Sequence, residues 1–161
     1  NNIQEERLIA SIMGTYAAEW ALGKAIQYSK EREAFGRQIG KFQVLRHKMA
    51  QMAITVEACR SFAFRAVAEF LEKGPEAIQT ISMAKAFVSE EALKVIHDAI
   101  QIHGGWGYHE DYGLARAWRD TRLMTIGAGT TEVMHEIISK MIVDDKQYKR
   151  QFLKARGQVA Q

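Results

Sequence analysis

The sequence contains only one cysteine and one proline, and it has no long uninterrupted apolar segment among its 161 residues. The single cysteine, Cys59, excludes an internal disulfide framework and most thiolate metal sites, and it fits a reducing compartment. No apolar run approaches the roughly 20 residues that a transmembrane helix needs, and no signal-peptide pattern is present. Val, Ile and Thr are spread among good helix formers, so the composition favours helices over strands.

The sequence also has little net charge, with 22 Lys and Arg against 19 Asp and Glu, or +3 at pH 7. This excess is too small to indicate nucleic-acid binding. A hydrophobic content of 47% is ordinary for a globular domain with a core. We therefore expect one domain at 1–142, followed by a basic C-terminal tail at 143–161 that is solvated. Since the chain begins inside a helical pattern, we also expect it to come from a longer polypeptide.

Apolar residues recur at helical spacing in four long segments and one short segment. The expected helices run from about Gln4 to Lys30, from Leu45 to Phe70, from Ile81 to Ile102, over 114–123 and over 131–142. Short loops between long helices predict antiparallel neighbours, and no segment requires a β-strand. The prediction is an all-α fold, an up-down antiparallel bundle of four long helices plus a short one.

Three of these helices carry an apolar stripe. The stripes are Ile9, Ile12, Met13, Tyr16 and Trp20 on the first; Leu45, Met49, Met52, Val56, Cys59, Ala63, Val67 and Phe70 on the second; and Ile81, Ala84, Val88, Ala92, Val95, Ala99 and Ile102 on the third. We expect the stripes to pack in the core, although Tyr16 and Trp20 could instead shape a pocket.

Glycine-containing loops separate the helices. The segment "QIHGGWG" follows a helix and not a strand, so it is not a dinucleotide fingerprint. Taken alone it predicts a helix C-cap and turn, or a close approach of backbone to a ligand or a neighbouring subunit. In "EKGPEA", Gly74 lies past one helix end and Pro75 suits the first turn of the next.

Two further loops are candidates for binding. In "KEREAFGRQIGKFQ", Arg32 and Arg37 flank Phe35, and a guanidinium there can make bidentate contact with phosphate; the alternative is a solvated turn. In "TIGAGTTEVMHEI", small residues lead into a helix N-terminus, which presents N–H groups to a polar or anionic group. No metal site is expected, because the spacing of the remaining candidates does not converge on one ion: His97, His103, His109, Glu110 and Asp111.

In this order, "REAFGRQIGKFQ", "QIHGGWGYHEDYGLARAWRD" and "IGAGTTEV" resemble the C-terminal helical domain of the acyl-CoA dehydrogenases over nearly the whole chain except the tail. The resemblance implies oxidation of the Cα–Cβ bond of an acyl-CoA thioester to the trans-2-enoyl thioester. FAD would take the hydride, and an electron-transfer flavoprotein would usually accept the electrons. The resemblance further implies an N-terminal helical domain and a middle β domain, both absent here, in a homo-oligomer (dimer or tetramer).

The same resemblance assigns cofactor contacts by motif. Arg32 would meet the flavin pyrophosphate, with Phe35 and Gln43 beside the adenosine part. The other implied contacts are Gln101, Gly104 and Gly105 with the FAD of the adjacent subunit, and Thr130, Thr131 and Glu132 with the flavin at the start of the last helix.

The catalytic base is not where most family members carry it. Their acid lies in the loop before the last helix, where this chain has Ala128. A subset similar to isovaleryl-CoA and long-chain acyl-CoA dehydrogenases carries it on the first helix in an "ERL"-like segment, which here is "EERLIA". The resemblance implies that Glu6 removes the weakly acidic α-proton, although a helix-start carboxylate can also be merely favoured by the dipole.

Neighbouring residues would complete the substrate site. Arg7 would position groups or balance charge. The backbone N–H of Ala128, next to Gly129, would donate to the thioester oxygen, where enolate charge develops. A small side chain at Ala128 would suit branched or bulky acyl groups.

Two other functions are open. The chain could be a non-catalytic helical oligomerisation or binding module, since it lacks the domain that covers the flavin. It could also belong to a relative with other chemistry, such as an acyl-CoA oxidase that passes electrons to oxygen, or a nitroalkane-oxidising enzyme. The expected location is the bacterial cytoplasm or, in a eukaryote, the mitochondrial matrix.

Overall fold

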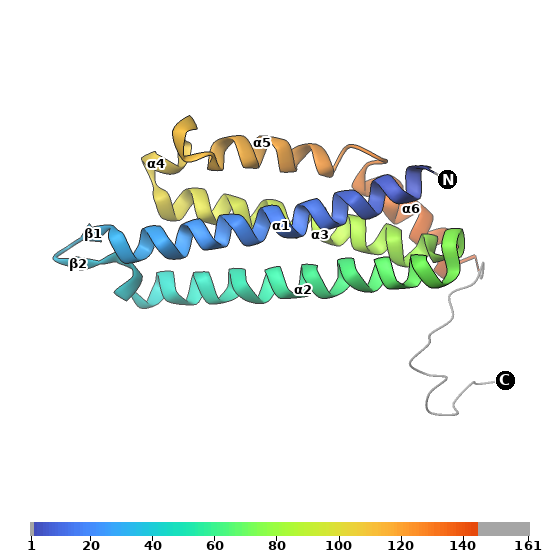
Figure 1. The fold of residues 1–161 in the computed structure, drawn as a ribbon, viewed down its shortest axis with the longest axis horizontal. Helices are drawn as coiled ribbons and strands as arrows, with labels where there is room; N and C mark the ends of the chain where they lie inside the picture. Colours follow the sequence, from blue (N-terminus) through green and yellow to red (C-terminus); the bar gives the residue numbers. More distant parts are fainter. Residues whose placement is uncertain (1, 145–161) are drawn as a thin grey trace, which may run out of the picture.

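The computed structural model describes residues 2–144 and confirms the all-α prediction (Figure 1). The helices are α1 Asn2–Glu31, α2 Gln43–Lys73, α3 Ile78–His103, α4 Gly105–Tyr108, α5 Leu114–Met124 and α6 Thr131–Ile142. Three helices are long, with 30, 31 and 26 residues, whereas α5 and α6 have 11 and 12 residues, so the last helix of the expected bundle is short. The tail expected at 143–161 lies outside the described residues except for Val143 and Asp144.

The long helices α1, α2 and α3 lie side by side and run up, down and up (Figure 1). The chain turns back through α4 at one end, and α5 then runs along α3 toward the end where α1 begins. There α6 packs on α3, so the start of α1, the α5–α6 loop and α6 gather at one end of the molecule. Among residues 2–144, no helix is both long and apolar enough to span a bilayer.

The core forms because α1 and α3 approach closely through small residues. Ala18, Ala21 and Ala25 of α1 are fully buried. At Gly14, an added Cβ would lie 3.1 Å from Val88 Cγ1 of α3. The stripe predicted on α3 is buried along its whole length, and no residue of the α2 stripe is exposed, so the structure confirms both.

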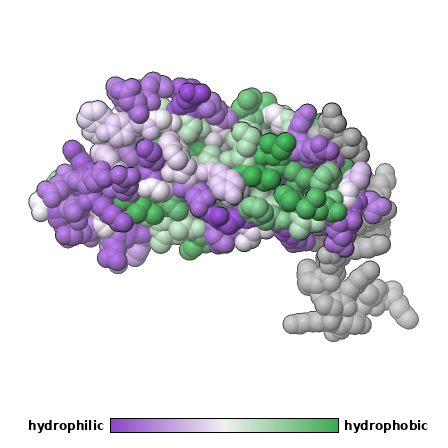
Figure 2. Space-filling model, viewed as in Figure 1, coloured by the Kyte–Doolittle hydropathy of each residue, from purple (hydrophilic) through white to green (hydrophobic). Residues whose placement is uncertain are grey.

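The prediction that the α1 stripe packs in the core is wrong. Ile9 and Met13 are each 55% exposed, Tyr16 50% and Trp20 41%. Figure 2 shows hydrophobic side chains gathered on this side of the molecule, over the N-terminal half of α1. The spacing identified a helical face correctly, but α1 turns the opposite face, rich in alanine and hydroxyl residues, toward α3.

A short β-hairpin, not expected from the sequence, joins α1 to α2. Strand β1 (Glu33–Ala34) pairs antiparallel with β2 (Arg37–Gln38). The two turn residues, Phe35 and Gly36, both have positive φ angles, 53° and 77°, as in the type I′ turn of two-residue hairpins. Strands of two residues are too short to give an alternating pattern, which explains why the sequence did not reveal them.

Candidate functional site

The loop between α5 and α6 holds a conformation that few side chains tolerate. Ala128 has φ 54° and Gly129 has φ 98°, both in the left-handed region. A Cβ on residue 129 would lie 2.8 Å from the end of the Met134 side chain, which would have to shift, and the backbone angle itself favours glycine. The Thr131 N–H donates to the Thr125 carbonyl at 3.0 Å and closes the loop.

The expected helix start is confirmed at the end of this loop. Thr130 is the N-cap of α6, and its Oγ1 accepts a hydrogen bond from the Val133 N–H at 3.3 Å. The next side chain, Thr131, is buried, and its Oγ1 has no partner within residues 2–144. A buried polar atom without a partner among the described residues is uncommon and requires a structural or functional reason.

Two buried cations hold the carbonyl groups of the loop from the interior. Arg7 Nε of α1 donates to the Ala128 carbonyl at 3.0 Å, and Lys85 Nζ of α3 donates to the Gly129 carbonyl at 2.5 Å. Arg7 is 5% exposed and Lys85 is fully buried. Together they fix the orientation of two successive peptide groups.

That orientation leaves N–H donors on the other side of the loop. Because a trans peptide is planar, its N–H points opposite to its C=O. The inward carbonyls of Ala128 and Gly129 therefore turn the N–H groups of Gly129 and Thr130 away from the cations. Within residues 2–144, the N–H groups of Ala128, Gly129 and Thr130 have no acceptor. They form a set of donors suited to an oxyanion or another acceptor.

The interior side of the loop is positively charged. Burial lowers the pKa of the Lys85 ammonium, and the nearby Arg7 guanidinium lowers it further, while Glu132 acts in the opposite direction. Burial also lowers the pKa of Arg7. Neither cation has a buried carboxylate partner among the described residues, so carbonyl oxygens take the place of a salt bridge.

Glu6, the residue predicted as base, lies on the exposed side of the first turns of α1. It is next to Arg7 in sequence, about 100° away around the helix, and it continues the exposed α1 stripe toward the loop end. Glu5 lies a further 100° or so away from the loop-facing side. The structure thus places Glu6 on the exposed face of α1 that carries Ile9 and Met13, one residue before Arg7, which contacts the loop.

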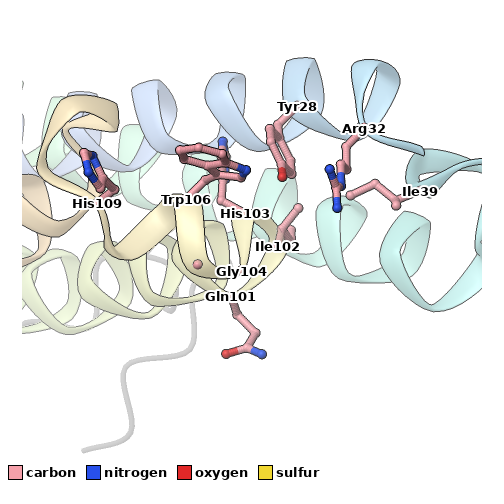
Figure 3. A pocket seen from close by; sticks show the side chains of 10 residues that line it. Tyr28, Arg32, Ile39, Gln101, Ile102, His103, Gly104, Trp106 and His109 are labelled. Carbon is pink, nitrogen blue, oxygen red and sulfur yellow. The ribbon is translucent and has the colours of Figure 1, made fainter. Parts of the chain in front are cut away.

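A hollow of about 530 Å³ lies at the end of the bundle opposite to the α5–α6 loop (Figure 3). It brings together four residues that the sequence assigned to cofactor binding: Arg32, Gln101, Gly104 and Gly105. Gly104 is the C-cap of α3 with φ 59°, as expected for this motif. In Figure 3 the Gln101 side chain points away from the rings of Tyr28 and Trp106.

His103 lines this hollow. Its ring stacks on Tyr28 with centroids 4.3 Å apart, and its Nδ1 lies 2.8 Å from the Ala99 carbonyl. Because a carbonyl only accepts, Nδ1 carries a proton and Nε2 is the acceptor of the neutral ring. Burial lowers the pKa of His103, which keeps the ring neutral at physiological pH.

Two predicted cofactor residues lie outside this hollow. Phe35 is 95% exposed at the hairpin tip, where its ring meets Phe42 edge-on. Gln43 begins α2 and lines a separate groove with Arg46 and His47. The structure therefore does not bring Phe35 and Gln43 together with Arg32 in one cavity.

A smaller hollow of about 330 Å³ lies beside the α5–α6 loop. It is lined by the remaining predicted residues, Thr130, Thr131 and Glu132. The pKa of Glu132 is lowered by its own backbone N–H and by the Thr130 hydroxyl. Sixteen residues of α3 separate Gln101 from Lys85, or about 24 Å at 1.5 Å per residue. The predicted cofactor residues thus form two groups at opposite ends of the bundle (Figure 1).

Sequence reasoning missed the contribution of α3 to the loop. Lys85 holds the Gly129 carbonyl, and Ser89 Oγ donates to the Met124 carbonyl at 3.2 Å. A signal was present, because Lys85 follows Ile81 by four residues and precedes Val88 by three. A lysine at such spacing lies on the apolar face of its helix.

Two of the residues considered for a metal have other partners. Glu110 pairs with Arg119 through two hydrogen bonds of 2.9 and 3.0 Å, and His103 is bound to the Ala99 carbonyl. Within the part of the chain that the structure describes, no three His, Cys, Asp or Glu residues converge on one point.

Comparisons with known proteins identify relatives over most of the chain. The sequence profile described as "Acyl-CoA dehydrogenase, C-terminal domain" matches residues 1–143. The long-chain specific mitochondrial acyl-CoA dehydrogenase of Sus scrofa is 35% identical over 144 residues, which are 89% of this chain and 33% of that protein. Subunit CarC of the caffeyl-CoA reductase–Etf complex of Acetobacterium woodii is 39% identical over 126 residues, 78% of this chain and 33% of that one.

The fold agrees with these relatives. The crystal structure of an acyl-CoA dehydrogenase from Geobacillus kaustophilus matches with a TM-score of 0.82 and 38% identity, covering 87% of this chain and 37% of that one. The chain spans about a third of the length of the curated relatives that it matches.

Proposed function

Since the chain belongs to the acyl-CoA dehydrogenase family, as its C-terminal helical domain, we propose that the full-length protein is an FAD-dependent acyl-CoA dehydrogenase. Its reaction is the α,β-dehydrogenation of an acyl-CoA thioester to the trans-2-enoyl-CoA. The observation that carries this proposal is the α5–α6 loop. Arg7 in the first turns of α1 holds its Ala128 carbonyl, and the N–H groups of Ala128, Gly129 and Thr130 have no acceptor within residues 2–144.

In the proposed reaction the loop binds the thioester carbonyl. Negative charge grows on that oxygen as the α-proton leaves, and the donors of the loop are fixed before the charge appears. The Ala128 N–H is the donor predicted to contact this oxygen. The small Ala128 side chain leaves space beside the reacting carbons.

Glu6 is the proposed base. Its carboxylate takes the α-proton, and a bound FAD would supply the acceptor for the hydride that leaves the β-carbon. The exposed apolar stripe that continues from Glu6 along α1, headed by Ile9 and Met13, supplies a hydrophobic wall for the acyl chain.

The described residues fit a flavin dinucleotide. The buried Thr131 hydroxyl without a partner supplies one hydrogen-bonding group near the loop. At the other end, Arg32 provides a guanidinium for phosphate, and Gly104 and Gly105 have no atoms within 4 Å of where a Cβ would lie, so backbone is open to approach. Because these groups lie at opposite ends, we propose that each FAD is shared between two subunits of a homo-oligomer.

The proposed electron acceptor is an electron-transfer flavoprotein. One relative is named as part of a caffeyl-CoA reductase–Etf complex, and a 39% identical solved structure is described as the electron transferring flavoprotein of Acidaminococcus fermentans. The first of these names also favours a second candidate function, in which the same site runs in reverse and reduces an enoyl-CoA thioester.

An anaerobic titration of the flavin tests the proposal. The full-length protein is mixed with linear, branched and aromatic acyl-CoAs while the flavin absorbance is followed. Bleaching by one class establishes the dehydrogenase half-reaction and identifies the acyl group. If the flavin is bleached only by an external reductant and reoxidised by enoyl-CoA, the reductase is supported instead. Rapid reoxidation by oxygen alone would indicate an oxidase, and absence of flavin would support the oligomerisation module.

A further inference from the structure

We propose that Lys85 is a positioning residue for the reaction, a role that rests on the proposed function. Its ammonium group holds the Gly129 carbonyl at 2.5 Å from inside the core and so keeps the Thr130 N–H turned toward the site. Arg7 does the same for the preceding peptide through the Ala128 carbonyl. The two cations orient successive donors of the loop.

A buried lysine is a costly means of holding one carbonyl group. The side chain is fully buried on α3, and removing an ammonium from water is strongly unfavourable unless it is compensated. A neutral hydroxyl is sufficient one turn away, where Ser89 donates to the Met124 carbonyl. A purely structural tether at Gly129 would therefore not need a charge.

The charge has a use at this particular carbonyl. Hydrogen bonds in series polarise one another, so a cation on the C=O of a peptide strengthens the N–H of the same peptide as a donor. The effect is largest where negative charge develops in a site of low dielectric constant. Lys85 does not touch the thioester and transfers no proton. It acts through the Gly129–Thr130 peptide, two peptides after the Ala128 N–H that is proposed to contact the thioester oxygen, so its charge favours the anion from behind the loop.

The surroundings of Lys85 support this assignment. Arg7 is the other charge that destabilises its ammonium form, and Glu132 on α6 is the carboxylate that favours it. Glu132 is exposed, so the described residues do not neutralise the pair of cations in the interior. The net positive charge behind the loop is thus available to an oxyanion in front of it.

The first experiment tests positioning without cofactor or substrate. Hydrogen exchange is measured on the flavin-free full-length protein at the Thr131 amide, which closes the loop on the Thr125 carbonyl. We expect about tenfold faster exchange in Lys85→Met. Ser82→Ala is the matched control, because Ser82 is buried on the same helix and its Oγ has no partner within residues 2–144; it should leave the exchange unchanged.

The second experiment tests the role of the charge. An acyl-CoA analogue with sulfur in place of the β-carbon can lose its α-proton but cannot complete the dehydrogenation. Its α-proton pKa in the flavin-loaded enzyme, followed by absorbance, should rise by about one pH unit or more in Lys85→Met, with its affinity changed less than about threefold. If Lys85→Met does not fold, Lys85→Gln keeps a donor and removes the charge.

The outcomes separate the two proposals. Unchanged exchange at Thr131 together with an unchanged α-proton pKa would overturn the role of Lys85. Faster exchange with an unchanged pKa would leave Lys85 as a structural tether and also overturn it. If wild-type protein fails to deprotonate the analogue at all, the proposed function fails, and the exchange data alone then decide whether Lys85 holds the loop.

Discussion

At the scale of single residues, the candidate site depends on polar groups at buried positions, where apolar side chains would stabilise the fold more. Arg7, Lys85 and Thr131 are all buried, and two of them are cations that neutralise no buried acid. Burying such groups costs free energy unless each finds a partner. Loop carbonyls satisfy the two cations, whereas the Thr131 hydroxyl has no partner within the part of the chain that the structure describes. We interpret the burial of these polar groups, which lowers stability, as a requirement of a binding site.

The proposed base can be tested by removing its charge. Glu6→Gln should slow flavin reduction by acyl-CoA about a hundredfold or more, because the amide cannot accept the α-proton, while flavin stays bound. Stopped-flow absorbance of the full-length enzyme measures this rate. Glu5→Gln is the matched control, since Glu5 is also exposed but lies farther around α1 from the loop; equal slowing by both changes would remove Glu6 from the mechanism.

His103 should make stability depend on pH. Its pKa in the folded protein is below the ordinary value of 6.5 because of burial, so the unfolded chain binds a proton more readily. The contribution of His103 to stability is therefore complete above about pH 6.5 and decreases as the pH falls through that value.

Thermal unfolding between pH 7.5 and about 5.5 should show a falling Tm, and His103→Phe should reduce that dependence. A slope that is the same in wild type and His103→Phe would show that His103 does not contribute.

At the scale of helices and strands, the sequence specified some elements better than others. The stripes of α2 and α3 face neighbours in the same chain, so their apolar spacing predicted burial correctly. On α1 most of the predicted stripe, including Tyr16 and Trp20, is exposed, because spacing shows that a face exists but not which partner covers it. The hairpin was missed since its conformation comes from positive φ at Phe35 and Gly36.

Part of the candidate site could also be predicted from the sequence. The glycine turn at Gly104 and the N-cap at Thr130 have local sequence signals, and both lie where those signals predicted. The contact from Lys85 to the loop joins residues 44 positions apart. It depends on how α3 and the α5–α6 loop pack, which no local pattern encodes.

The close packing of α1 on α3 can be tested at two glycines of the same helix. Gly14→Val should lower the free energy of unfolding by about 1–3 kcal/mol, because even a Cβ at this position lies 3.1 Å from Val88 Cγ1. Gly23→Ala should raise it by about 0.5–1 kcal/mol, because no atom lies within 4 Å of its Cβ. Urea unfolding measures both, and similar effects at the two positions would contradict the close approach.

At the scale of the whole molecule, the two groups of predicted cofactor residues lie at opposite ends of a long bundle. One end carries the loop, Glu6 and Thr131, and the other carries Arg32 and the glycine turn. A single FAD bound by both groups of one chain would have to cross the length of α3. A site made from one end of each of two subunits has no such requirement and follows from two-fold symmetry.

Mixing two inactive variants distinguishes these arrangements. Glu6→Gln should abolish the base at one end, and Arg32→Glu should repel the cofactor phosphates at the other. If the site is shared, a mixed dimer contains one site with both changes and one site with neither. Random mixing gives about half mixed dimers, so co-refolding should restore about a quarter of wild-type activity. If each site lies within one subunit, every site carries one change, and the mixture should stay as inactive as its parents.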